Sequence, residues 1–161
     1  MLQRRWILNA SAGALLAGAV GAPVGVWAQV QDVNDAINKA GRQRMLSQRM
    51  AKAWLMLAHQ ADANPARQAL AQSIKLFERQ LAELKAYAPQ ADIRTTYTEL
   101  EAAWATYKTV LTTAQPSKDA ASSLLQADAK VLALAHQGTV QYEAASGKPV
   151  GHLVNVAGRQ R

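Results

Sequence analysis

Apolar residues recur along most of the chain at steps of three and four residues, the spacing of one face of an α-helix. One such stripe consists of Leu70, Ile74, Phe77, Leu81, Leu84 and Ala88. A second consists of Ile93, Tyr97, Leu100, Trp104, Tyr107, Leu111 and Ala114, and a broader one of Leu124, Leu125, Val131, Leu132, Leu134 and Tyr142. No segment alternates as a strand does, so the pattern predicts an all-α protein with Tyr and Trp in its core.

Proline and glycine divide this pattern into four candidate helices. No glycine occurs between Arg42 and Gln137, and the prolines in that interval are Pro65, Pro89 and Pro116. The stretches between these breakers are each long enough for a helix and span residues 30–63, 65–88, 93–114 and 117–147. Short turns between amphipathic helices favour antiparallel neighbours packed at shallow angles. The sequence therefore predicts an up-down, antiparallel four-helix bundle.

The expected helix ends carry residues that suit them. Pro65 fits a first helical turn, and Asp92 and Ser117 are expected to cap the third and fourth helices. After Pro149, the start of a fifth helix is expected near Val150, at the C-terminus of the bundle.

The first helix places an arginine where a bundle normally has an apolar residue. Its expected seam consists of Val30, Val33, Ile37, Ala40, Arg44, Ser47, Ala51, Trp54 and Ala58. No Asp or Glu occurs from residue 36 to 61, so the helix itself offers Arg44 no acid. A buried guanidinium has to be paired, either with a carboxylate from another helix or with an anion from solution. Arg42, Lys39 and Lys52 are instead expected to be solvated surface residues whose stems cover apolar neighbours.

The overall charge narrows the classes of partner. The 161 residues suffice for one domain, and the formal charge of +7 favours nucleic acid, an anionic membrane surface or small anions. The chain contains no cysteine, which excludes disulfides, zinc–thiolate sites and thiol catalysis.

Residues 1–28 have the features of an export signal. Arg4 and Arg5 precede a Gly- and Ala-rich apolar run that ends in small residues at Ala28. The paired arginines also resemble a twin-arginine signal, so both export routes stay open. The alternative is an uncleaved anchor in the inner membrane, because residues 10–28 are nearly long enough to span it. Export to the periplasm removes nucleic acid from the expected partners.

No pattern typical of an enzyme occurs in the sequence. His59, His136 and His152 lie far apart, without a convincing second metal ligand at helical spacing. Glu99 and Glu101 would project about 200° apart on a helix, so they do not form an acid/base pair. The chain also lacks a nucleophile elbow, a P-loop and a dinucleotide fingerprint. We therefore expect no enzymatic activity, no metal and no cofactor.

The arginine-rich part of the first helix carries a family resemblance. The stretch INKAGRQRMLSQRMAKAW, residues 37–54, resembles the signature helix of the N-terminal domain of type IV pilus methyl-accepting chemotaxis transducers. That domain is related to the sensor domain of nitrate/nitrite sensor histidine kinases. The shared pattern is present here as Ala40, Gly41, Arg44, Met45 and Arg49.

The resemblance implies a helical bundle that forms a homodimer through its first helix and acts with a membrane sensor or chemoreceptor. It also implies a small inorganic anion at the dimer axis, held by Arg44 and by backbone near Gly41, with Arg49 as a supporting charge and Lys39 nearby. The residues between the motif positions follow the pilus-transducer pattern rather than the nitrate-kinase pattern, so the identity of the anion stays open.

The last residues repeat the motif. VNVAGRQR, residues 154–161, matches INKAGRQR, residues 37–44, in six of eight positions. The expected organisation is thus a signal peptide in residues 1–28, a sensor-like bundle in residues 29–148 and the truncated start of a second repeat in residues 149–161.

Two functions follow from these observations. One is an exported, periplasmic, non-enzymatic sensor module that binds a nitrate- or nitrite-like anion through Arg44. The other is a structural or protein-interaction bundle without a small-molecule ligand, in which Arg44 pairs with Glu78, Glu101 or Asp128 of a neighbouring helix.

Overall fold

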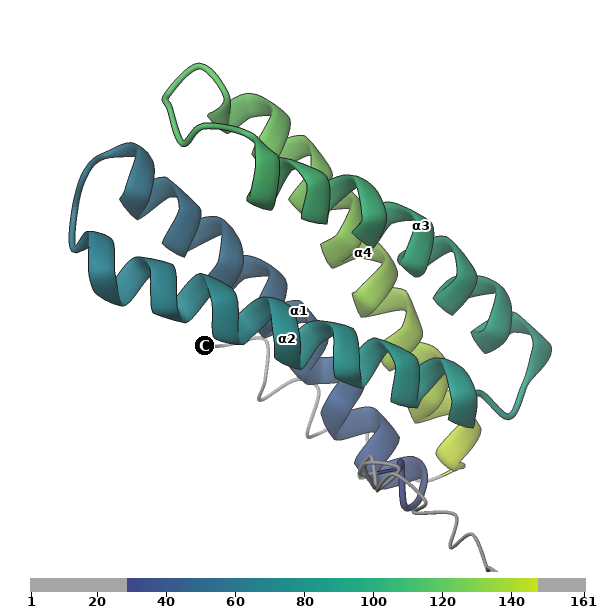
Figure 1. Cartoon of the computed structure of the whole chain (residues 1–161). Helices are drawn as coiled ribbons and strands as arrows, with labels where there is room; N and C mark the ends of the chain where they lie inside the picture. The colour runs from purple at the N-terminus through teal and green to yellow at the C-terminus, as the bar shows by residue number, and fades with distance from the viewer. Residues whose placement is uncertain (1–28, 148–161) are drawn as a thin grey trace, which may run out of the picture.

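The computed structural model describes residues 29–147, which form four α-helices. These helices are α1 (Val33–Ala58), α2 (Ala63–Tyr87), α3 (Ala91–Thr113) and α4 (Ala121–Ser146). They run alternately up and down, as Figure 1 shows, and residues 29–147 contain no strand. The predicted all-α, antiparallel four-helix bundle is confirmed. The predicted export signal in residues 1–28 and the fifth helix near Val150 lie outside the described residues.

Acidic residues mark the starts of α1 and α3, in different ways. Asp32 caps α1, because its Oδ1 accepts a hydrogen bond from the backbone N–H of Asp35 at 2.8 Å. The prediction that Asp92 caps α3 is wrong, since Gln90 occupies the N-cap position. Asp92 lies in the first turn instead, where its Oδ1 accepts from the N–H of Ile93 and its charge favours the positive end of the helix dipole.

The remaining helix ends follow the expected chemistry more closely. Pro65 lies in the first turn of α2, as predicted. Ser117 Oγ accepts from the N–H of Ala120, so it closes the turn that leads into α4 rather than capping the helix itself. Gly147 ends α4 with a φ of 61°, a left-handed conformation that glycine adopts without a steric penalty.

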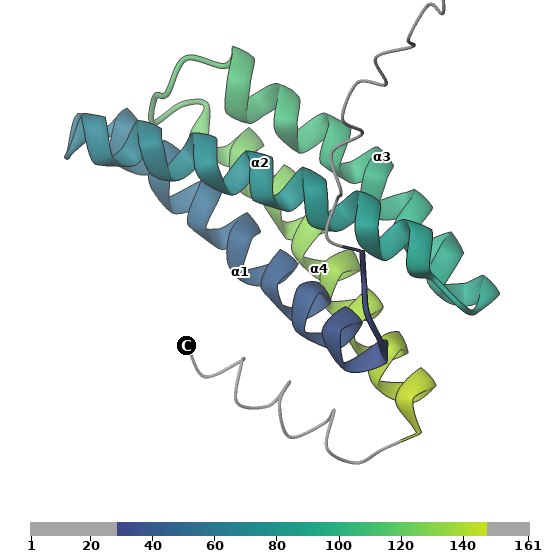
Figure 2. The ribbon, with the colours of Figure 1, turned by 60° about the horizontal axis from the view of Figure 1, so that its bottom comes forward.

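The four helices are not equally close to one another. Helix α1 packs against both α2 and α4, and α3 packs mainly against α4, whereas α2 and α3 approach less closely (Figures 1 and 2). Large side chains bridge this wider separation. The rings of Phe77 and Trp104 stack with their centroids 4.3 Å apart, and Lys108 pairs with Glu78. Helix α1 is therefore the helix around which the bundle is organised.

Most of the predicted stripes lie in the core. Trp54, Tyr97, Tyr107 and Tyr142 are fully buried, which confirms the assignment of these aromatic residues to the core. The apolar side of α4 is narrower than predicted, because Leu125 is 50% exposed.

Gly138 in α4 allows Tyr97 of α3 to pack directly against the helix backbone. A Cβ atom built on Gly138 would lie 2.8 Å from Cε2 of the Tyr97 ring, closer than non-bonded carbon atoms can approach. Tyr97 is fully buried and has little room to move aside. Gly41 in α1 differs, because a Cβ there would meet no atom of the described residues within 4 Å.

This contrast gives a prediction with an internal control. Gly138→Ala should destabilise the protein by about 1–3 kcal/mol through overpacking against Tyr97. Gly41→Ala should instead stabilise it by up to about 1 kcal/mol, because alanine is the better helix former. Urea unfolding followed by circular dichroism measures both changes, and equal stability of the two variants would contradict the packing described for Gly138.

A second pair of variants tests the burial of the α2 stripe. Leu81 is 5% exposed, so Leu81→Ala should lower the free energy of unfolding by about 2–5 kcal/mol through lost burial and a residual cavity. Leu125→Ala should change it by less than about 0.5 kcal/mol, because that side chain is half exposed. Urea unfolding measures both changes, and comparable losses of stability at the two positions would contradict the exposed position of Leu125.

Candidate functional site

The buried face of α1 is rotated relative to the predicted seam. Its buried residues are Ala36, Ile37, Ala40, Gln43, Leu46, Ser47, Met50, Ala51, Ala53 and Trp54. Gln43, rather than Arg44, takes the central buried position, and its Nε2 donates to the backbone oxygen of Phe77 in α2 at 2.9 Å. Burying a neutral amide costs less than burying a guanidinium, so the rotation leaves Arg44 half-buried at the edge of the seam.

Arg44 faces α4 from this edge. Its Nη1 lies 3.5 Å from Nδ1 of His136, a geometry that suits the imidazole tautomer with its proton on Nε2. Two of the acids considered as partners for Arg44 are engaged elsewhere, because Glu78 pairs with Lys108 and Glu101 with Lys85. The half-buried guanidinium therefore lies between α1 and α4, two helices that pack side by side (Figure 2).

The other arginines and the motif glycine lie near Arg44 but are more open. Arg42 and Arg49 are exposed, as predicted for Arg42, and Met45 between them is 48% exposed. Gly41 is half-buried, and the space beside its Cα is open in the described chain. The motif thus presents a basic surface on α1 with room for another group next to Gly41.

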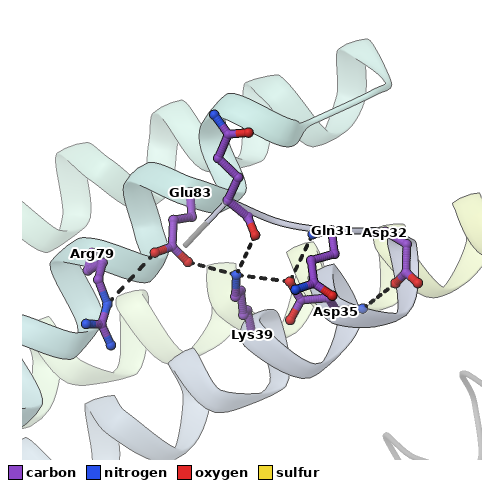
Figure 3. Close-up of polar contacts among 7 residues, drawn as sticks. Gln31, Asp32, Asp35, Lys39, Arg79 and Glu83 are labelled. Atoms are coloured by element: carbon purple, nitrogen blue, oxygen red, sulfur yellow. Dashed lines mark hydrogen bonds and ion pairs between the residues drawn. The ribbon is translucent and has the colours of Figure 1, made fainter. Parts of the chain in front are cut away.

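Lys39 occupies a different environment, shown in Figure 3. Its Nζ lies 3.0 Å from Asp35 in α1 and 2.9 Å from Glu83 in α2, and it donates to the backbone oxygen of Gln29 at 3.4 Å. The Lys39 side chain is 12% exposed, so the prediction of a solvated surface lysine is wrong. The reason is that Glu83, which is only 7% exposed and also lies 3.8 Å from Arg79, needs a cation.

The charges around Lys39 also set its protonation. Burial lowers the pKa of Lys39, but hydrogen bonds and charge attraction from Glu83 and Asp35 outweigh burial and raise it above 10.5. A raised pKa means that the stabilisation is fully present at neutral pH and disappears only as pH rises through the folded-state value. Lys39 therefore links α1 to α2, whereas Arg44 contacts α4, and the structure does not bring the two together.

Among the described residues, no group of three or more His, Cys, Asp or Glu side chains could hold a metal ion. His59 is exposed at the C-cap of α1, and His136 contacts Arg44. His152 lies outside the described residues. Glu99 and Glu101 are both exposed.

Sequence reasoning missed a buried polar cluster between α1, α3 and α4. Asp128 is 9% exposed, and its carboxyl group lies against the hydroxyl groups of Ser47 and Tyr107. The Tyr107 hydroxyl donates to the backbone oxygen of Ser47 at 3.0 Å, and the Ser47 hydroxyl donates to the backbone oxygen of Arg44 at 3.0 Å. Burial raises the pKa of Asp128, and the polar Ser47 and Tyr107 hydroxyl groups beside it partly oppose this rise. The sequence does contain a sign of this cluster: Asp128 stands four residues after Leu124 and three before Val131, so it lies on the apolar stripe of α4.

A paired substitution tests the role of Lys39. Lys39→Met keeps the apolar stem but leaves Glu83 buried without its closest cation, so it should destabilise the protein by about 2–4 kcal/mol. Arg79→Met should cost at most about 1 kcal/mol, because the Arg79 side chain is 50% exposed. Thermal unfolding at neutral pH measures both effects, and a harmless Lys39→Met would mean that the cluster contributes little.

Comparison with known proteins assigns the chain to a family. The sequence model described as type IV pili methyl-accepting chemotaxis transducer N-term matches residues 26–139, which include α1, α2, α3 and most of α4. No curated protein and no solved structure matches the chain. None of the helices in residues 29–147 combines the length and the apolar character needed to cross a membrane. The chain belongs to the family of type IV pili methyl-accepting chemotaxis transducer N-terminal domains.

Proposed function

We propose that this protein is an exported, non-enzymatic sensor module that binds a small, nitrate- or nitrite-like anion through Arg44. The observation that carries the proposal is the position of Arg44, which is half-buried at the edge of α1 next to His136 and one turn from the open backbone at Gly41. Membership of a family of sensory chemotaxis domains supports the same function.

The proposed binding arrangement is a homodimer with α1 at its interface. Two copies meeting along α1 bring two Arg44 guanidiniums together, and these repel each other because α1 carries no acid from residue 36 to 61 to offset their charge. A planar anion between the guanidiniums accepts two fork-like pairs of hydrogen bonds and replaces repulsion by attraction. Each close charge pair contributes up to about 4 kcal/mol before desolvation, at an effective dielectric constant of about 20.

The residues around Arg44 have separate roles in this proposal. The open space at Gly41 admits the anion or the partner helix close to the backbone. The exposed Arg49 adds positive potential about one and a half turns from Arg44 along α1. Lys39 takes no direct part, because two carboxylates already hold its ammonium group.

The proposed location is the periplasm, after export by the signal in residues 1–28. Domains of this family are typically extracytoplasmic sensors, which agrees with that location. In this proposal the module interacts with a membrane sensor or chemoreceptor and signals to it whether the anion is bound.

The second candidate function is a structural or interaction bundle without a small ligand. The contact between Arg44 and His136 within one chain favours it, because such a contact can hold α1 against α4 without any anion. The two functions differ in what the removal of Arg44 does to the fold.

Anion-dependent thermal unfolding distinguishes these functions. An anion at 100 times its dissociation constant stabilises a protein by about 2.7 kcal/mol, so nitrate and nitrite should raise the melting temperature of the wild-type protein. Arg44→Ala should abolish this rise while leaving the fold intact. Arg44→Lys should lose most of it, because an ammonium group cannot form the planar fork. Arg42→Ala, an exposed neighbour, is the control and should respond to anions as the wild type does.

Sedimentation of the same variants tests the dimer. Nitrate should shift the wild-type protein towards the dimer and should have no such effect on Arg44→Ala. The sensor function is wrong if no small anion changes the melting temperature of the wild type and Arg44→Ala unfolds the protein.

A further inference from the structure

A second site lies on the same side of the bundle, where the C-terminal half of α1 meets the first half of α4. It is a groove of about 470 Å³. Its lining residues are Gln48, Ala51, Lys52, Leu55, Met56, His59, Ala61 and Asp128. None of the motif residues Gly41, Arg44 and Arg49 is among them, so the groove is separate from the proposed anion site.

Asp128 is the chemical feature that distinguishes this groove from an ordinary surface depression. The residue lines the groove although it is 9% exposed, and its Oδ1 has no hydrogen-bond partner among the described residues. The Ser47 and Tyr107 hydroxyl groups lie beside the carboxyl group on the protein side, but each donates its proton to a backbone oxygen. A buried carboxylate oxygen without a donor is costly, and the second torsion of an Asp side chain turns easily, so a donor in the groove can reach either oxygen.

The end of α1 gives a second reason for a positive group at this position. Leu55 and Met56 belong to its last turn, where the helix dipole is negative, and that turn contains no basic residue, while His59 follows as the C-cap. The backbone dipole and Asp128 therefore favour the same charge. A primary ammonium group satisfies both, because it carries a positive charge and three donors.

The groove also has a positive and an apolar side. Lys52 is exposed at its rim, and no ion pair within 4.0 Å joins Lys52 to Asp128. A bare cation would be repelled by Lys52, whereas a carboxylate next to the ammonium group would be attracted to it. Leu55 and Met56 are half-buried and offer apolar surface for the rest of a ligand.

We propose that this groove binds small zwitterions of the amino-acid type. The ligand ammonium donates to Asp128, its carboxylate faces Lys52, and a medium-sized apolar side chain lies along Leu55 and Met56. This site adds a second class of ligand to the module, and its occupancy does not depend on an anion at Arg44.

Calorimetry on the full chain with L-leucine and L-methionine tests the proposal. Two matched probes separate the parts of the ligand: 3-methylbutylamine has the ammonium without the carboxylate, and 4-methylpentanoate has the carboxylate without the ammonium. Both amino acids should bind, the amine should bind more weakly, and the acid alone should not bind, because Asp128 would repel it.

Variants of Asp128 and Lys52 locate the site. Asp128→Asn keeps the shape but removes the charge, so it should weaken leucine binding by about tenfold or more while leaving the melting temperature unchanged or higher. Lys52→Gln should weaken leucine binding and strengthen binding of the amine, because it removes the charge that repels a bare cation. Asp119→Asn, an exposed acid just before α4, is the matched control and should bind as the wild type does.

Three results would overturn the proposal: no heat of binding with either amino acid or the amine at millimolar concentration, binding that survives Asp128→Asn, or equal binding of 4-methylpentanoate. Arg44→Ala should still bind leucine, so failure of the anion site and failure of this site are distinguishable. Loss of leucine binding in Arg44→Ala, with the fold intact, would show that the groove is not an independent site.

Discussion

The organisation of this bundle depends on how the positive charge of α1 is accommodated. The helix packs between α2 and α4, yet it carries no acid from residue 36 to 61. Its two half-buried cations, Lys39 and Arg44, both contact side chains of neighbouring helices. Glu83 of α2 holds Lys39, and His136 of α4 contacts Arg44, whereas Arg42 and Arg49 remain in solvent. The rotation of α1 buries Gln43 in place of Arg44 and so keeps a guanidinium out of the core, because only the amide can be buried without a counter-charge.

Polar groups in the core join the helices at defined points. Gln43 donates to the backbone of α2, Tyr107 donates from α3 to the backbone of α1, and the Tyr142 hydroxyl donates from α4 to the backbone oxygen of Leu84 at 2.7 Å. A stripe of purely aliphatic residues could slide by a turn at small cost, but these bonds are satisfied in only one alignment. They fix the height of α1 relative to its neighbours and so fix where the motif meets α4.

Both proposed sites lie on the side of the bundle where α1 and α4 meet. Arg44 and His136 lie in the middle of this side, and the groove lined by Asp128 lies towards the C-terminal end of α1. The two proposed sites have opposite charge preferences, since a guanidinium attracts anions and a buried carboxylate attracts ammonium groups. A ligand in the groove would contact both α1 and α4. An anion at Arg44 would contact the surface of α1 that a second copy of the chain is proposed to cover. Such a surface suits a module that reports ligand binding to a membrane partner.

The sequence by itself determined the helical elements and the family. Steps of three and four residues specified the stripes of α2 and α3, and the Ala-Gly-x-x-Arg-Met-x-x-x-Arg pattern pointed to the chemotaxis transducer domains. It did not determine the rotation of α1, the burial of Lys39 or the exposure of Leu125. Adjacent helical positions differ by only 100°, so a stripe can be shifted by one residue without changing its spacing.

Only the tertiary structure decided which polar residues meet. Lys39 and Glu83 are far apart in the chain, and so are Ser47, Tyr107 and Asp128. No local sequence pattern predicts that the members of either cluster will meet. Pairings of this kind depend on which helices are neighbours and on their relative height, because a hydrogen bond or ion pair is formed only within a few ångströms. The sequence could name Arg44 as a charge in need of a partner, but the packing of α4 against α1 determined that His136 would lie beside it.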